Sequence, residues 1–306
     1  FAFVLLSIIF ISCNNEPKVY QWRSENRSGI YNEENLLKSW PENGPELVWE
    51  FEELGLGYGT PVFTESNMYV LGEIDSLGYL FNFDLEGKLI WKKEYGQEWT
   101  LTFRGSRSTP TVVGNLLYLI SGMGDIYCYD AISGDKKWQK ELKKDFQGEY
   151  TMHGHSESPI IEGDMVYLMP GGVEFNVVSL NRFTGELIWK NKGKGERPAY
   201  NAPQIIKLAT RNVLVQFSAY NLMGFDPKTG ELLWAYEQDN MPVEKRKMGM
   251  GDTHSNTIVY ENGFIYYVAG DGNCGIKLAL AEDGSSVEEI WRNAQLDGFM
   301  GGVLNI

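Results

Sequence analysis

The chain has 306 residues, of which 43% are hydrophobic and 13% aromatic, so it can build a core and is not an intrinsically disordered protein. Its 41 acidic residues outnumber 27 basic ones and give a net charge of −14. This charge disfavours nucleic acids and anionic lipid surfaces as partners.

The chain begins with an apolar run, residues 1–11, that leads into Ser12-Cys13 and a polar stretch. Eleven residues are too few to span a bilayer but suit the apolar core of a secretory signal. With the cysteine, the pattern resembles the lipobox of bacterial lipoproteins. The resemblance implies a truncated signal peptide over residues 1–12 and acylation of the Cys13 thiol, which would anchor the protein to a membrane outside the cytoplasm. An ordinary signal peptide or an uncleaved anchor is the alternative.

Residues 13–45 are then expected to form a lipidated tether and a lead-in segment. Within it, Glu33–Ser39 is a candidate short helix. The next stretch, Glu46–Phe51, carries Trp49 and is predicted to be a lone outer strand, because no partner strands precede it.

From there on, a phrase made of a strand, a tight turn and a second strand ending in tryptophan recurs. In its clearest copy, residues 176–191, Val177–Leu180 is apolar, Asn181 and Gly185 supply the turn chemistry, and Trp189 ends the second strand. Successive copies lie 47, 51, 45 and 57 residues apart, counted between Trp91, Trp138, Trp189, Trp234 and Trp291. A period of this length in an all-strand pattern is typical of propeller blades with four strands each.

A second element, a pair of strands, lies between these phrases. Proline precedes the first strand in four copies, where its missing N–H breaks no ladder, and Ile258 replaces it in the fifth. Unbroken apolar runs such as Leu116–Ile120 indicate strands covered on both faces. Together the elements predict an all-β propeller of four-stranded blades, with complete blades over residues 60–96, 108–142, 157–192, 201–237 and 255–293.

Residues 301–306 are expected to start a further inner strand. A propeller commonly closes its ring by combining its first and last strands in one blade, and here that partner is missing. We therefore expect residues 46–306 to be a C-terminally incomplete propeller domain, with seven or eight blades in the full-length protein.

These repeats resemble the pyrroloquinoline-quinone-like (PQQ-like) repeat family of β-propellers over nearly all of the chain after residue 20. That family contains quinoprotein alcohol dehydrogenases as well as a lipoprotein that assists outer-membrane barrel assembly, so it defines the fold far better than the function. The enzymes imply PQQ, a calcium ion, a catalytic aspartate and a disulfide between adjacent cysteines. Here no two cysteines are adjacent, and no aspartate can be matched securely to the catalytic one.

In a propeller, the loops that enter the inner strand share one face of the disc with the turns between the second and third strands. The Asp/Asn-to-Gly turns lie on the opposite face and repeat one formula. The first face varies from blade to blade, as a recognition surface would, and carries all three histidines. We predict that it binds a ligand at the mouth of the channel through Arg104, Arg107, His153, His155, Glu157, Tyr200, Asn201, Asp252, His254 and Asn256.

Loop histidines bonded to the backbone and simply solvated arginines are the plainer explanation of the same residues. A metal site is disfavoured, since His155 and His254 belong to non-adjacent blades and no compact ligand spacing occurs. Hydrolase motifs are absent as well. We therefore predict no catalytic residue, no metal and no cofactor.

The resulting hypothesis is a non-catalytic binding or scaffold lipoprotein of the bacterial cell envelope, on its periplasmic or extracellular side. It would recognise a protein or an extracellular polymer and contact the membrane only through Cys13. The alternative is a PQQ-dependent alcohol or polyol dehydrogenase that uses PQQ and calcium.

Overall fold

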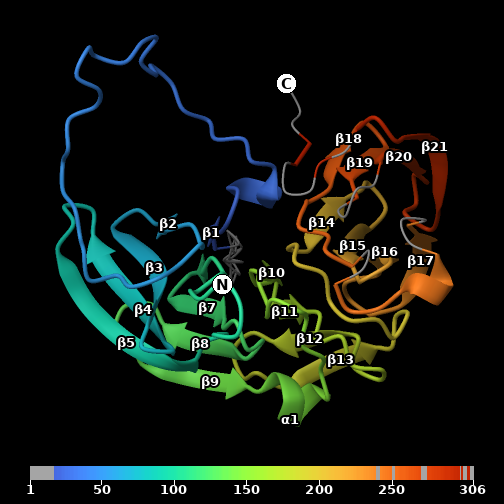
Figure 1. Ribbon diagram of the computed structural model, residues 1–306, viewed down its shortest axis with the longest axis horizontal. Coiled ribbons are helices and arrows are strands. Elements are labelled where there is room, and N and C mark those ends of the chain that lie inside the picture. The colour runs from blue at the N-terminus through green and yellow to red at the C-terminus, as the bar shows by residue number, and fades with distance from the viewer. Residues whose placement is uncertain are drawn as a thin grey trace, which may run out of the picture.

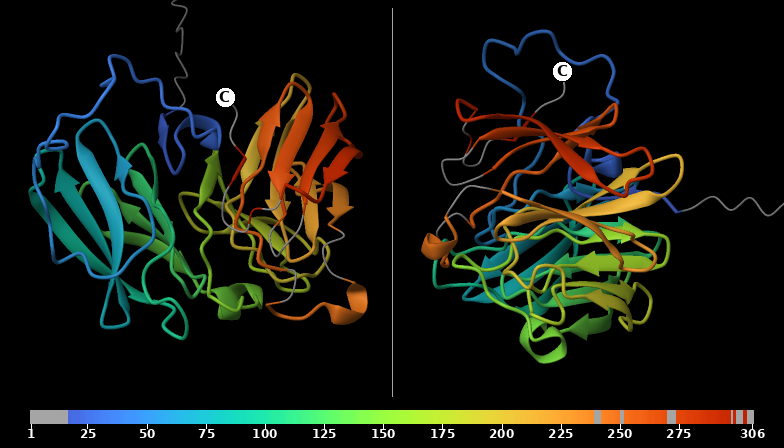
Figure 2. Two further views of the ribbon diagram at one scale, coloured as in Figure 1. Left: turned by 45° about the horizontal axis from the view of Figure 1, so that its top comes forward. Right: turned by 90° about the vertical axis from the view of Figure 1, so that its right-hand side faces the viewer.

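The computed structural model describes residues 17–238, 242–249, 252–269, 274–296, 298 and 302–303. This part of the chain folds into five antiparallel sheets arranged around a common axis (Figures 1 and 2). Each sheet contains four strands that are consecutive in the chain, and one sheet gains a fifth strand from the lead-in segment. The predicted all-β propeller of four-stranded blades is confirmed.

The blades follow the predicted ranges. Blade one contains β2 (Val62–Phe63), β3 (Asn67–Ile74), β4 (Leu77–Asp84) and β5 (Leu89–Gln97), and blade two contains β6 (Thr111–Val113), β7 (Leu116–Ile120), β8 (Ile126–Asp130) and β9 (Lys136–Lys140). Blade three contains β10 (Ile160–Glu162), β11 (Met165–Leu168), β12 (Val177–Asn181) and β13 (Leu187–Asn191). Blade four contains β14 (Gln204–Lys207), β15 (Asn212–Phe217), β16 (Asn221–Phe225) and β17 (Leu232–Glu237). Blade five contains β18 (Val259–Glu261), β19 (Phe264–Val268), β20 (Gly275–Leu280) and β21 (Val287–Asn293).

Within each blade the first strand lies toward the axis and the fourth toward the rim, as β10 and β13 illustrate (Figure 1). Because all the strands are antiparallel, the connections fall on two faces. We call "loop face" the side with the connections between the second and third strands and between blades. We call "hairpin face" the side with the turns between the first and second strands and between the third and fourth.

The hydrophobic core lies between blades rather than inside one of them. One cluster packs Leu80 of blade one against Leu117 of blade two, and another packs Val178 of blade three against Cys128 of blade two. The third strands are therefore covered on both sides, and all five residues of β16 are buried. A blade cannot cover its faces alone, so each one depends on its neighbours.

The repeated tryptophan links each blade to the next. The indole N–H of Trp189 in blade three donates to the backbone oxygen of Pro227 in the blade-four turn at 2.9 Å. Its ring also covers Gly230, whose φ of +74° and lack of a Cβ allow the close approach. The same donation reaches Ile132 from Trp91, Arg182 from Trp138 and Gly284 from Trp234.

Two predicted elements are absent from the described chain. Glu33–Ser39 is not helical; it is exposed, so a helix there would bury no apolar face. Glu46–Phe51 is not a strand, because no neighbouring strand pairs with it. Trp49 nevertheless packs on Phe83 with ring centroids 6.1 Å apart and covers Gly87, which is the contact that the fourth-strand tryptophans of blades one, two and three make with Gly134, Gly185 and Gly230.

The helices of the described residues are short: α1 (Leu142–Phe146) and the 3₁₀ turns η1 (Glu25–Arg27) and η2 (Val243–Lys245). Among the described residues, no helix is both long and apolar enough to cross a membrane. The predicted signal segment, residues 1–12, and Cys13 lie outside the described residues, as does most of the strand predicted at 301–306.

Candidate binding site

Loops of blades two, three and four bring aromatic and polar side chains together on the loop face. Phe103 packs edge-on against the ring of His153 at 5.1 Å between centroids, and the Tyr200 ring lies 5.8 Å from the His153 ring in a tilted arrangement. The Tyr200 hydroxyl accepts a hydrogen bond from the backbone N–H of His153 at 3.2 Å, and Nδ1 of His153 lies 3.1 Å from the Thr102 hydroxyl. We call Thr102, Phe103, Arg107, His153 and Tyr200 the loop-face cluster.

Arg107 holds the loop that presents this cluster. Its guanidinium donates to the backbone oxygens of Thr102 at 2.8 Å and Gly105 at 3.1 Å, and also to that of Phe103. Burial lowers the pKa of Arg107, with nearby acidic groups opposing it. Because its donors are taken up by the loop, Arg107 positions Phe103, which stays 66% exposed.

Beneath the cluster lies a buried carboxyl group that the sequence analysis missed. Glu98 accepts hydrogen bonds from the Tyr95 hydroxyl and, at 2.6 Å, from the backbone N–H of Gly122. Burial raises the pKa of Glu98 to about 7, although these hydrogen bonds and Arg107 act in the opposite direction. The next residue, Trp99, donates its indole N–H to the Thr102 hydroxyl at 2.9 Å and so supports the cluster from below.

Two predicted site residues of blade three are buried behind this surface. His155 Nε2 lies 3.1 Å from the Glu149 backbone oxygen, and burial lowers the pKa of His155 to about 4. Glu157 accepts the backbone N–H of Met169 at 3.1 Å, and burial raises the pKa of Glu157 to about 7. Both side chains line a small cavity together with Leu142 and Phe146.

The predicted residues at the junction of blades four and five are also buried. Asp252 forms an ion pair with Arg197 at 2.6 Å. His254 stacks on Phe217 and places Nε2 3.1 Å from the Ala219 backbone oxygen. Asn201 donates to the backbone oxygen of Asn256 at 3.3 Å, so this group of four joins two blades and does not face a surface ligand: Asn201, Asp252, His254 and Asn256.

Arg104 remains on the loop face, half exposed, but its guanidinium is paired with the buried Glu73 of blade one. The structure thus brings together Arg107, His153 and Tyr200, and the backbone N–H of Tyr200 also donates to the backbone oxygen of the buried His254 at 2.9 Å. Phe103 was missed, although a bulky apolar residue in a polar loop is a readable signal. Glu98 gave no such signal, because its burial depends on the neighbouring blade.

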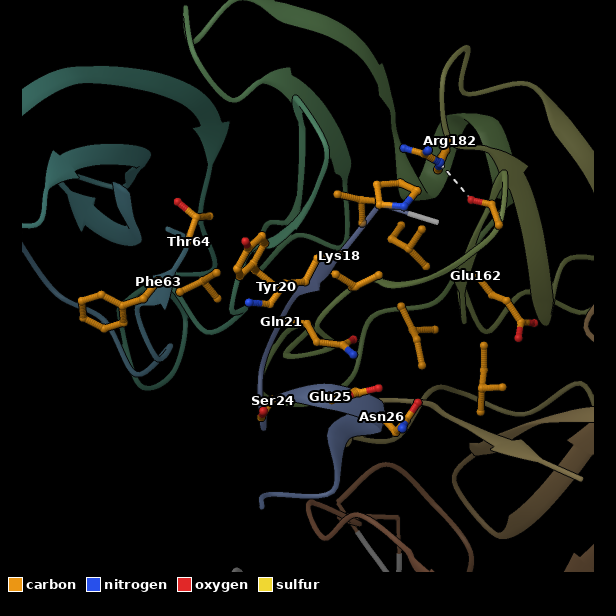
Figure 3. Close-up of a pocket in the computed structure, with 18 of the residues that line it drawn as sticks. Lys18, Tyr20, Gln21, Ser24, Glu25, Asn26, Phe63, Thr64, Glu162 and Arg182 are labelled. Atoms are coloured by element: carbon orange, nitrogen blue, oxygen red, sulfur yellow. Dashed lines mark hydrogen bonds between the residues drawn. The ribbon is translucent and has the colours of Figure 1, made fainter. Parts of the chain in front are cut away.

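A cavity of about 1360 Å³ lies on the axis and opens toward the hairpin face. Lead-in residues Lys18, Tyr20 and Gln21 line it opposite Phe63 and Thr64 of blade one (Figure 3). None of the predicted loop-face residues belongs to its lining. The channel cavity and the loop-face cluster are therefore distinct places on the molecule.

The groups that a PQQ–calcium centre would require can be compared with the described residues. No three His, Cys, Asp or Glu side chains of the described chain lie close enough together to hold a metal ion. Cys128 and Cys274 are free and buried, and burial raises the pKa of the Cys128 thiol to about 12. Arg27 also occupies the loop-face end of the channel, bonded to backbone oxygens.

Radial four-stranded blades joined by tryptophan-to-turn links define a β-propeller of PQQ-like repeats. The chain belongs to the family described as outer membrane protein assembly factor BamB, whose family model matches residues 78–305.

Its relatives include proteins of two kinds. Outer membrane protein assembly factor BamB of Burkholderia pseudomallei is 25% identical over 82% of this chain, which spans 58% of that protein. Quinoprotein alcohol dehydrogenase PedH of Pseudomonas putida is 26% identical over 46% of this chain, which spans 25% of that enzyme. The chain thus spans between a quarter and three fifths of these relatives.

Solved structures share the fold. BamB from Moraxella catarrhalis superposes with a TM-score of 0.53 and 18% identity, covering 76% of this chain and 59% of that one. A europium-containing methanol dehydrogenase superposes with a TM-score of 0.56 and 13% identity, covering 80% and 53%. Since both kinds of protein share the architecture, the function has to be argued from the site.

Proposed function

We propose that this chain is a non-catalytic binding propeller of the bacterial cell envelope that recognises a partner with its loop face. The observation that carries the proposal is the set of exposed apolar side chains on loops of this face. They come from blades one, two, three and five: Leu56, Tyr58, Leu101, Phe103, Met152, Val173, Val243 and Met248. Exposed apolar groups rimmed by polar ones are typical of interaction surfaces.

The hairpin face differs in kind. Its exposed apolar residues include Ile132 and Phe183, which occupy the same position of the repeated turn, two residues after Asp130 and Asn181. Both residues therefore belong to the turn sequence that recurs in every repeat of this kind. The loop face has no such formula, which favours it as the recognition surface.

A protein is the partner class that the comparisons favour, since relatives over most of this chain bear the name of a protein assembly factor. An extracellular polymer is the second partner class within the same proposal. Aromatic and histidine side chains such as Phe103, His153 and Tyr200 suit either, because they combine apolar area with hydrogen-bonding groups. No cofactor is part of this function.

Anchoring through an acylated Cys13, on the periplasmic or outer side of the envelope, completes the proposal. The apolar run that ends at Ser12-Cys13 supports it. When the full-length gene is expressed, Cys13→Ala should move the protein from the membrane fraction to the soluble fraction. Retention of the variant in membranes would show that something else anchors the chain.

Photocrosslinking in the native host tests the binding face. A benzophenone amino acid placed at Phe103, 66% exposed on the loop face, should yield a crosslinked species that an excess of unlabelled protein abolishes. The matched position is Phe183, 49% exposed on the hairpin face, which should yield none. Crosslinks that form only at position 183 would place the binding surface on the hairpin face and contradict the proposal.

A quinoprotein dehydrogenase is the alternative function, favoured by relatives of that name that match nearly half of the chain. Within the described part of the chain, no three His, Cys, Asp or Glu side chains are grouped closely enough to hold a metal ion, which favours the binding proposal. Titration of the purified full-length protein with PQQ and calcium decides between the two functions. A saturable change in quinone absorbance, with dye reduction by an alcohol, would replace the binding proposal by the enzyme.

A further inference from the structure

The lead-in segment, residues 17–29, runs through the middle of the ring. At its start, β1 (Val19–Tyr20) adds a fifth strand to blade two by pairing with β6 (Figure 1). Further along, Nη1 of Arg23 lies 3.3 Å from the Thr257 hydroxyl of blade five. The segment thus touches blades on different sides of the axis, although it belongs to none of the repeats.

The blades themselves are joined near the axis by a hydroxyl group placed just before the first strand. The backbone N–H of Thr60 in blade one donates to the Thr109 hydroxyl of blade two at 3.0 Å. The backbone N–H of Thr109 donates in turn to the Ser158 hydroxyl of blade three, also at 3.0 Å. Blade four has Ala202 at the equivalent position, so no hydroxyl continues this chain of links from blade three.

Arg27 of the lead-in lies where that link is missing. Its Nη2 donates to the backbone oxygens of Ser158 and Pro159 in blade three, at 3.0 and 2.5 Å. Its Nη1 donates to the backbone oxygen of Pro203 in blade four at 3.2 Å. The Gln204 side chain donates back to the Arg27 backbone oxygen at 3.2 Å. One side chain therefore joins blades three and four.

Burying the Arg27 guanidinium is energetically costly, which indicates that its contacts are specific. Arg27 is 0% exposed, and a buried guanidinium is strongly unfavourable unless its N–H groups are satisfied. Burial lowers the pKa of Arg27 to about 9, while the buried carboxyl group of Glu157 acts in the opposite direction. Nε is satisfied within the lead-in by the Gln21 side chain at 3.1 Å.

Arg27 also separates the two faces. Its acceptors Ser158, Pro159 and Pro203 precede the first strands, at the loop-face end of the channel. The channel cavity lies on the other side, where Ser24 and Asn26 of the lead-in line it (Figure 3).

We propose that residues 17–29 form a plug that closes the loop-face end of the central channel, and that Arg27 locks this plug by bridging blades three and four. The plug confines a loop-face ligand to the surface and leaves the channel cavity open only toward the hairpin face. Release of Arg27 would free the lead-in from blades three and four. The core cluster between blades one and two, against which Tyr20 packs, does not contain Arg27.

Limited trypsin digestion combined with hydrogen exchange tests the plug. In the wild type, cleavage after Arg23 should be slow, since this residue is held between Thr257 and the Ser28 backbone oxygen. Arg27→Ala should accelerate that cleavage by about tenfold or more and speed amide exchange in β1, β10 and β14, with blade-one exchange unchanged. Lys228→Ala, an exposed change on the hairpin face, should do neither.

Arg27→Ala removes the donor from four acceptors, of which the Pro159 backbone oxygen keeps the Thr111 hydroxyl as a donor. If that variant folds poorly, the gentler Gln204→Ala keeps the test decisive. Gln204→Ala removes one hydrogen bond to the Arg27 backbone and should speed exchange in β1 by a smaller factor. Wild-type cleavage after Arg23 in a folded Arg27→Ala protein would overturn the proposal. So would lead-in exchange that matches global unfolding in Gln204→Ala, because the lead-in would then be no separate plug.

Discussion

The two faces of the propeller hold the blades together in different ways. On the hairpin face one contact recurs: a tryptophan indole donates to the backbone of the next blade's turn, as Trp138 and Trp189 do. On the loop face, apart from the hydroxyl links near the axis, the blades are joined by contacts that differ, such as the Arg104–Glu73 pair and the Arg197–Asp252 pair. The residues that stack the blades on the hairpin face therefore recur from blade to blade, whereas the residues of the loop face differ more between blades.

The largest effect should come from breaking the repeated contact. Trp189 is buried and donates to Pro227, so Trp189→Ala should lower the free energy of unfolding by about 3–5 kcal/mol in urea denaturation. Ile132→Ala, at a turn position of the same face that is 68% exposed, should cost less than about 1 kcal/mol. Equal losses in both variants would show that burial of the tryptophan against the next blade is not what stabilises the stack.

Below the loop face, buried carboxyl groups should make stability depend on pH. Since burial raises the pKa of Glu98 from 4.5 to about 7, the folded state binds more protons than the unfolded state between these values. Its contribution is fully present below pH 4.5 and is lost as the pH rises through 7. Glu98→Gln should therefore flatten the decline in unfolding free energy between pH 5 and 8 by about 2 kcal/mol.

Burial of His155 changes the pH dependence of stability in the opposite direction. The effect of Glu98 is therefore measured as the difference between the wild type and Glu98→Gln. Burial lowers the pKa of His155 to about 4, so its contribution is present above pH 6.5 and is lost as the pH falls toward 4. This contribution is common to the wild type and Glu98→Gln and cancels in their difference. Identical pH profiles for the two proteins would contradict the assignment of a shifted pKa to Glu98.

The turn glycines meet two requirements, a positive φ and space for the neighbouring indole ring. A smaller effect on stability should distinguish the two. Gly230 has a φ of +74°, and a Cβ there would lie 2.5 Å from the Trp189 ring, whereas Gly163 has a φ of +54° with nothing within 4 Å of its Cβ. Gly163→Ala should cost about 1 kcal/mol from backbone strain alone. Gly230→Ala should cost more, since the ring must also move. Equal costs in thermal denaturation would mean that the indole contact carries no energy.

The blades and their boundaries could be predicted because their signals are local. The turn from Asn181 to Gly185 and Trp189 lie within one phrase, and the repeat multiplies that signal. Burial of His155 and His254 could not be predicted in this way, because neighbouring blades cover them. The role of Arg27 could not be predicted either, because its acceptors lie 131–176 residues further along the chain.

Trp49 lies between these cases. Its sequence context predicts a strand, and the structure lacks that strand because no neighbour pairs with it. Its ring still takes the expected place against Gly87. Side-chain packing thus follows the repeat even where the backbone pairing is absent.

The central claim, that the hairpin face stabilises and the loop face binds, is tested most directly by one crossed comparison. Phe103→Ala and Trp189→Ala are each measured for melting temperature and for capture of the species crosslinked at position 103, at a temperature where both are folded. Phe103→Ala should reduce capture by about tenfold with the melting temperature unchanged, and Trp189→Ala should lower the melting temperature while capture persists. Unchanged capture in Phe103→Ala, with capture lost in Trp189→Ala, would contradict the account.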